Sequence, residues 1–129
     1  MRLLLAVLLL AHGAAMGQTF ACQYTASAGL NWENGRWEAT RFKTDPPFFL
    51  TAEAGELTAS SVAKALKSEN PKSWRCERFR LGTLFQCVDS LGGLLIFDLK
   101  IGRGGVAQIL GTVLGVDSAV VTPFTCQQM

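Results

Sequence analysis

The pattern of apolar and polar residues predicts a chain built mainly of short strands. Short runs rich in aromatic and β-branched side chains alternate with clusters of Gly, Pro, Asn, Asp and Ser, which is typical of strands and turns. Asn34-Gly35 separates two such runs and is the strongest short hairpin signal a sequence offers. The predicted strands are residues 20–24, 30–33, 36–42, 48–52, 74–79, 84–89, 94–99 and 118–122.

The period of the pattern changes in two segments. After residue 55 the apolar residues recur at helical spacing, with Thr58 or Ser60 as an N-cap, so we predict a helix over residues 59–67. Residues 104–111 lie in a second segment that fits the helical template better than strict alternation, and we expect a short helix there, although its β-branched residues leave a strand open. The apolar residues of this second segment are Val106, Ile109, Leu110 and Val113.

These elements predict an α+β fold. Because the strands follow one another as hairpins, we expect a mostly antiparallel sheet or a small partly closed β-barrel, with one or two short helices against it. Pro46-Pro47 interrupts the pattern, since two prolines cannot continue a central strand. We also expect the chain to turn at Pro123 and the last strand to end before it.

The first residues, MRLLLAVLLLAHGAAMGQ, predict an export signal. Arg2 precedes an apolar run of about nine residues, and Ala15 and Gly17 supply the small residues of a cleavage site before Gln18. A membrane span needs roughly twenty apolar residues. We therefore expect residues 1–17 to be a signal peptide and residues 18–129 to be a single periplasmic or secreted domain with no membrane span; a retained anchor and lipidation of Cys22 are the alternatives.

The four cysteines predict two disulfides in such an oxidising compartment. Cys76 and Cys87 would face each other across a hairpin that turns at Leu81-Gly82, which leaves Cys22 and Cys126 to join the first strand to the last. No CxxC pair supports a metal clip or a redox switch, although three arginines flank Cys76 and would favour a reactive thiol.

Charge and composition exclude several functions. Without the leader, 11 basic groups face 10 acidic ones, and this net charge of +1 is no footprint for nucleic acid. His12 is the only histidine and lies in the leader, so we expect neither a histidine-dependent nucleophile nor a histidine-bound metal. The glycines at 102–105 lack the lysine of a phosphate-binding loop, so we interpret them as a turn. We expect no enzyme activity and no cofactor.

Asp98 is the one carboxylate that the pattern places in an apolar strand. A buried carboxylate needs a partner. We expect either an ion pair with Arg103 or hydrogen bonds from the backbone of the glycine turn, and we favour a structural ion pair over a functional site.

The aromatic residues are the candidates for binding. Trp32 and Trp37 are equidistant from the Asn34-Gly35 turn and should face each other, either as a pair that caps the core or as a platform for a flat ligand. The candidate ligand-binding residues are Trp32, Trp37, Phe42, Phe48 and Phe49. The resulting hypothesis is a non-catalytic, monomeric binding module for a small ligand or an envelope protein. A structural or envelope-associated protein without a discrete site, or an inhibitor of a lytic enzyme, is the alternative.

Several motifs resemble those of a group of small exported proteobacterial proteins with four cysteines. They are C-x-Y at Cys22, GLxWexGrW from Gly29, PFFL from Pro47, C…GT…C-x-D from Cys76, LGGxLxFD from Leu91 and D-S-x-x-V-x-P-F-T-C from Asp117. The resemblance implies an exported, disulfide-bearing protein. It implies no activity, because none is known for the group.

Overall fold

The computed structural model describes residues 17–80, 82–109 and 118–129. The predicted signal peptide, apart from Gly17, and Leu81 of the predicted turn lie outside these residues, as do Leu110 and Val113. The described strands form one sheet. They are β1 (Gln18–Tyr24), β2 (Ala28–Glu33), β3 (Arg36–Arg41), β4 (Phe48–Glu53), β5 (Glu56–Leu57), β6 (Trp74–Arg78), β7 (Leu84–Asp89), β8 (Gly93–Asp98), β9 (Arg103–Gln108) and β10 (Ser118–Gln128).

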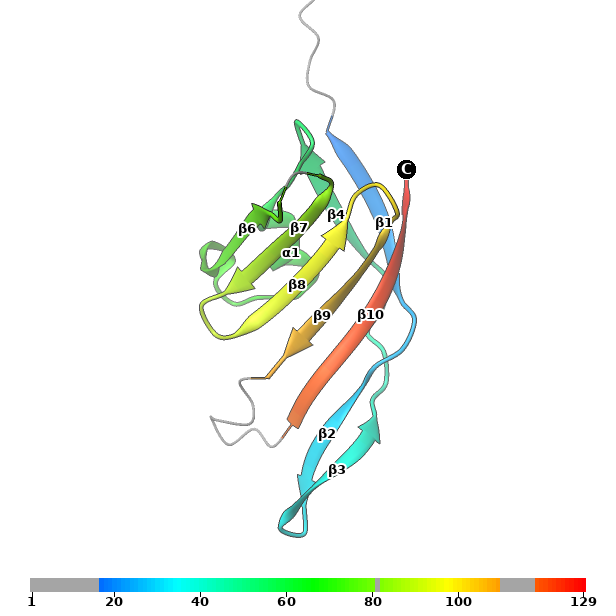
Figure 1. Cartoon of the computed structure of the whole chain (residues 1–129), viewed down its shortest axis with the longest axis vertical. Helices are drawn as coiled ribbons and strands as arrows, with labels where there is room; N and C mark the ends of the chain where they lie inside the picture. Colours follow the sequence, from blue (N-terminus) through cyan, green and yellow to red (C-terminus); the bar gives the residue numbers. More distant parts are fainter. Residues whose placement is uncertain (1–16, 81, 110–117) are drawn as a thin grey trace, which may run out of the picture.

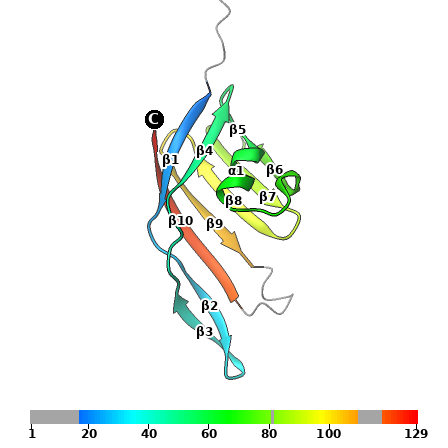
Figure 2. The same ribbon diagram turned by 180° about the vertical axis from the view of Figure 1, so that it is seen from behind.

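The sheet curves into a nearly closed, antiparallel barrel (Figure 1). Its strand order is β5-β4-β1-β10-β9-β8-β7-β6, and β10 also pairs with β2, which carries β3 at its far edge. A helix, α1 (Ala59–Ala65), lies over the open side between β4 and β6 (Figure 2). A short 3₁₀ helix, η1 (Pro71–Ser73), lies in the connection between α1 and β6. The α+β class and the mostly antiparallel sheet are therefore confirmed.

Alternation along the strands places the core on the concave side of the sheet. Phe20, Phe97 and Phe124 are almost fully buried there. Their rings pack at centroid distances of 5.3 Å for Phe20–Phe97 and 5.7 Å for Phe97–Phe124. Val62 and Ala63 of α1 close this core. The helix thus buries the inner face that the strands cannot cover alone.

The predicted helix at residues 59–67 is confirmed, with its regular part ending at Ala65. Thr58 occupies the N-cap position, but its hydroxyl bonds to Thr51 of β4 rather than to the helix. Lys67 has a φ of +51°, in the left-handed region where a helix commonly ends. Within the described residues, no helix is long and apolar enough to cross a membrane.

The helix predicted for residues 104–111 is wrong over residues 104–108, which belong to strand β9, so the strand alternative is correct there. Gly104 and Gly105 explain the difference. A Cβ on Gly104 would lie 2.4 Å from both the carbonyl oxygen of Ile96 and the Phe124 ring. Gly104 lets β9 pass close to its neighbours, and the two glycines together hide the alternation, because they put no side chain on either face.

The last strand is longer than predicted, since β10 continues through Pro123 to Gln128. On one side, β10 pairs with β2 as far as Val121 and with β1 from Phe124 onwards. Pro123 therefore lies where the strand that β10 pairs with changes. Its carbonyl accepts hydrogen bonds from the backbone N–H and the hydroxyl of Thr25, at 3.0 and 3.2 Å. A proline fits here because irregular pairing, unlike a regular ladder, does not require its missing N–H.

Both predicted disulfides are confirmed. Cys76 and Cys87 are directly opposed on β6 and β7, and Phe79 donates its N–H to the carbonyl of Leu84, as the hairpin register requires. Cys22 and Cys126 are directly opposed on β1 and β10. Each disulfide therefore links adjacent strands that are already in register.

Candidate functional site

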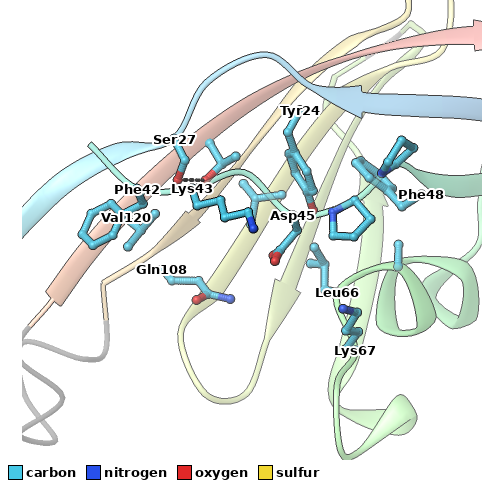
Figure 3. A pocket seen from close by; sticks show the side chains of 15 residues that line it. Tyr24, Ser27, Phe42, Lys43, Asp45, Phe48, Leu66, Lys67, Gln108 and Val120 are labelled. Atoms are coloured by element: carbon cyan, nitrogen blue, oxygen red, sulfur yellow. Dashed lines mark hydrogen bonds between the residues drawn. The ribbon is translucent and has the colours of Figure 1, made fainter. Parts of the chain in front are cut away.

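A cavity of about 260 Å³ opens on the concave side of the sheet (Figure 3). One wall is the connection between β3 and β4, residues 42–47, together with Phe48 at the start of β4. The opposite wall is made by two cross-strand pairs on the inner face of β9 and β10, Val106 with Thr122 and Gln108 with Val120. The end of α1 closes the third side through Leu66 and Lys67. The cavity is thus assembled from segments that are far apart in the sequence.

The 42–47 connection is fixed at both ends. The backbone N–H of Phe42 donates to the carbonyl of Ser27 at 2.9 Å. The hydroxyls of Ser27 and Thr122 hydrogen-bond to each other at 3.1 Å, which ties this point to β10. Pro46 and Pro47 keep the segment out of the sheet ladder, and Phe48 then enters the core as the first residue of β4. The connection therefore spans the cavity without pairing with any strand.

Aromatic rings form the apolar wall at the β1 side. Tyr24 packs on Phe48 with 4.7 Å between ring centroids, and Phe48 meets Phe124 edge-on at 5.1 Å. Such pairs add about 0.5–1.5 kcal/mol beyond the burial of their area. Phe48 is buried, whereas Tyr24 and Phe42 are half-buried and offer part of their surface to the cavity.

Tyr24 links this wall to the charges of the site. Burial and, to a lesser extent, the nearby Asp45 carboxylate together raise the pKa of its hydroxyl to about 12. The hydroxyl is therefore protonated at neutral pH and can donate a hydrogen bond. The same shift shows that the field of Asp45 reaches the Tyr24 hydroxyl, as their placement in Figure 3 indicates.

Four polar side chains around the cavity form no ion pair or side-chain hydrogen bond within the described residues. Lys43 and Asp45 extend from the connection, Lys67 from the end of α1 and Gln108 from β9 (Figure 3). Ion pairs among the described residues join Arg36 to Glu38 at 2.7 Å and Arg78 to Glu56 at 4.0 Å, and none involves these four side chains. They are therefore free to interact with a bound molecule.

The five aromatic residues predicted to bind do not form one surface. Trp32 and Trp37 face each other on the β2–β3 hairpin with 5.2 Å between ring centroids, as expected. They are 44% and 40% exposed, and the hairpin projects beyond the barrel (Figure 1). Phe49 points to the outer face and is 58% exposed, beside a separate hollow next to α1. Only Phe42 and Phe48 line the cavity.

Most of the residues that complete the site were not predicted from the sequence. Tyr24, Lys43, Asp45 and Lys67 were not proposed as binding residues. A signal was present in the break at Pro46-Pro47, since a segment that cannot join a ladder leaves its charged side chains free to face a cavity. Tyr24 and Lys67 carry no local signal, because only the fold brings them to that segment.

Asp98 has a structural role. Its Oδ1 accepts hydrogen bonds from the Thr83 hydroxyl at 2.7 Å and from the backbone of Lys100 at 2.8 Å. The bond from Thr83 is the main reason that the pKa of Asp98 is lowered, followed in the same direction by the backbone bonds. Arg103 is opposite Asp98 on β9 but forms no ion pair with it among the described residues. The backbone alternative is thus confirmed, and the expected ion pair is wrong.

The interpretation of residues 102–105 as a turn is correct only for Gly102, which lies in the turn between β8 and β9, because Gly104 and Gly105 belong to strand β9. Within the described ranges, no group of three or more His, Cys, Asp or Glu side chains is placed to hold a metal ion. No protein-family model, curated protein or solved structure matches the chain. The chemistry of the site is therefore argued from the cavity itself.

Proposed function

We propose that this protein is an exported, non-catalytic binding module that holds a small ligand in the cavity beside Tyr24. The observation that carries the proposal is the combination, around one hollow, of aromatic walls with charged side chains that form no ion pair in the described part of the chain. Ligand sites typically have largely apolar linings with a few polar groups that fix orientation. The placement of Phe42 and Phe48 in the cavity wall supports the aromatic binding surface expected from the sequence.

The size of the cavity sets the size of the ligand. A cavity of about 150 Å³ is enough to hold benzene, and drug-sized ligands occupy pockets of roughly 300–1,000 Å³. At about 260 Å³, this cavity suits a molecule of one ring or a short chain.

Export is part of the same proposal. The two disulfides are compatible with an oxidising extracellular compartment. The leader-like residues 1–17 support delivery to the periplasm or the exterior.

A second candidate function is recognition of an envelope protein through the β2–β3 hairpin. The observation in its favour is that Trp32 and Trp37 are partly exposed on a projecting hairpin whose outer strand, β3, pairs with β2 alone among the described strands. Exposed aromatics beside a free strand edge suit contact with another chain.

A blocking variant tests the first proposal. Gln108→Trp places a large ring over the cavity from an exposed position, whereas Gln23→Trp places the same ring on the outer face of β1. We expect benzoate, benzamide or benzylamine at millimolar concentration to shift NMR signals of Tyr24 and Leu66 in the parent protein. These shifts should persist in Gln23→Trp and disappear in Gln108→Trp.

Two outcomes would contradict the proposal. Absence of shifts at the cavity for all three probes would exclude a site for ligands of this size. Shifts confined to the indole signals of Trp32 and Trp37, unchanged by Gln108→Trp, would favour the hairpin instead.

A further inference from the structure

Building on the proposed function, we propose that the ligand is a small monoanion with an apolar body, such as an aromatic or short aliphatic acid. The apolar body would lie among the rings and aliphatic side chains of the inner cavity. The anionic group would lie at its mouth, between Lys43 and Lys67. The inner end of the cavity is apolar and its mouth is positively charged, and this difference defines the class of ligand.

The inner part of the cavity is apolar. Phe48 and Val106 are buried, at 7% exposure each, and they face the cavity from β4 and β9. Leu66 and Val120 add aliphatic surface from α1 and β10. The Ser27 and Thr122 hydroxyls, which could have made this wall polar, bond to each other. A ligand therefore gains most at this end by placing hydrocarbon against it.

The mouth of the cavity has an excess of positive charge. Lys43 and Lys67 contribute two ammonium groups and Asp45 one carboxylate, and none of the three is paired within the described part of the chain. Figure 3 shows Lys43 and Asp45 extending into the space from the connection and Lys67 approaching from the end of α1. One negative charge on the ligand would balance this set.

Asp45 limits the charge that the site accepts. Its field reaches the Tyr24 hydroxyl, where it disfavours a second negative charge by raising the pKa of that group. The protonated Tyr24 hydroxyl and the Gln108 amide are neutral donors for an anion's remaining oxygen. A cationic ligand, by contrast, would be repelled by two lysines and attracted by only one carboxylate.

Three probes of similar shape but different charge test this inference. Isothermal titration calorimetry at neutral pH would compare benzoate with neutral benzamide and cationic benzylamine, and hexanoate would represent the aliphatic acids. We expect benzoate to bind about three- to tenfold more tightly than benzamide, since charge pairs at exposed positions are weak. Benzylamine should bind more weakly than benzamide, and added salt should weaken only the anions.

Charge variants locate the effect. Lys43→Gln combined with Lys67→Gln should remove the preference for benzoate over benzamide while benzamide binding is retained. Asp45→Asn should strengthen benzoate binding about two- to fivefold. Lys64→Gln is the matched control, because Lys64 is an exposed lysine of α1 that does not line this cavity. It should leave the ratio unchanged.

The outcomes separate the two proposals. Equal or tighter binding of benzamide or benzylamine at the cavity would overturn the anion inference and leave the binding function standing. An equal loss of preference in Lys64→Gln would also overturn it, because the effect would then reflect overall charge. No binding by any probe would remove the proposed function itself. Tighter binding of hexanoate than of benzoate would indicate an aliphatic ligand body, and tighter binding of benzoate an aromatic one.

Discussion

At the scale of single residues, Tyr24 is the side chain that joins the apolar wall to the charged mouth of the cavity. It is the only tyrosine in the chain. Its ring packs on Phe48, and its hydroxyl lies within the field of Asp45. Both the burial and the carboxylate favour the neutral phenol, and burial is the larger cause. The ionisation of one residue therefore reports on how closed the cavity is.

The ionisation of Tyr24 can be measured directly. An ultraviolet titration of phenolate absorbance should give a pKa of about 12 in the folded protein. Asp45→Asn should lower this value only partly, because burial remains. A pKa near the ordinary value of 10.0 in the folded protein would show that Tyr24 is open to solvent.

The same shift has a consequence for stability. Because the folded-state pKa is raised, the contribution of Tyr24 is complete below pH 10.0 and is lost as the pH rises towards about 12. The urea midpoint of the parent protein should therefore fall more steeply over this window than that of Tyr24→Phe. Identical slopes would mean that the phenolate costs nothing in the folded state.

At the scale of elements, β9 shows how two adjacent glycines can occupy very different sites. A Cβ on Gly104 would clash with the backbone of Ile96 and the ring of Phe124. Next to it, a Cβ on Gly105 would lie 3.9 Å from the carbonyl oxygen of Thr122, an ordinary contact. The close approach of β9 to its neighbours therefore depends on Gly104 and not on Gly105.

This difference predicts unequal effects of alanine. Gly104→Ala should lower the free energy of unfolding by about 1–3 kcal/mol, as overpacking of a core does. The matched variant Gly105→Ala should stay within about 0.5 kcal/mol of the parent protein. Urea denaturation followed by tryptophan fluorescence would measure both. Equal losses would argue against the close packing of β9 on β8 and β10.

The elements also show what the sequence could predict. The two hairpins at Asn34-Gly35 and between Cys76 and Cys87 depend on local signals, and both registers are correct. The strand β9 was missed because two glycines hide its alternation. The length of β10 was missed because Pro123 is tolerated only through a change of neighbouring strands. That change is a property of the sheet and has no signature within residues 118–128.

At the scale of the whole molecule, the two disulfides constrain the chain to different extents. The disulfide between Cys22 and Cys126 spans 104 positions and joins the first described strand, β1, to the last, β10 (Figure 1). The bond between Cys76 and Cys87 spans 11 positions within one hairpin. In the chain-entropy model, a loop of about 100 residues is worth about 4.7 kcal/mol and one of about 15 residues about 3 kcal/mol.

The long-range disulfide should therefore matter more. Cys22→Ala with Cys126→Ala should lower the free energy of unfolding by roughly 4–5 kcal/mol, and Cys76→Ala with Cys87→Ala by roughly 3 kcal/mol. The two double variants are matched, since both remove one buried and one half-buried cysteine. A larger loss for the hairpin pair would contradict the entropic explanation.

The cavity belongs to the same scale, which explains why the sequence predicted it only in part. Phe42 and Phe48 were identified because they are aromatic. Tyr24, Lys67 and the pairs on β9 and β10 come from four separate segments. Only closure of the sheet, with α1 across its open side, places them around one hollow.

The central claim, that this hollow binds the ligand, is tested most directly through Tyr24. With ¹³C-labelled tyrosine the protein gives ring signals from this residue alone. During a benzoate titration these signals should shift along the same saturation curve that calorimetry gives, and the shift should be lost in Gln108→Trp. Unmoved Tyr24 signals at saturating benzoate, with shifts of the Trp32 and Trp37 indoles instead, would contradict the claim and place binding on the hairpin.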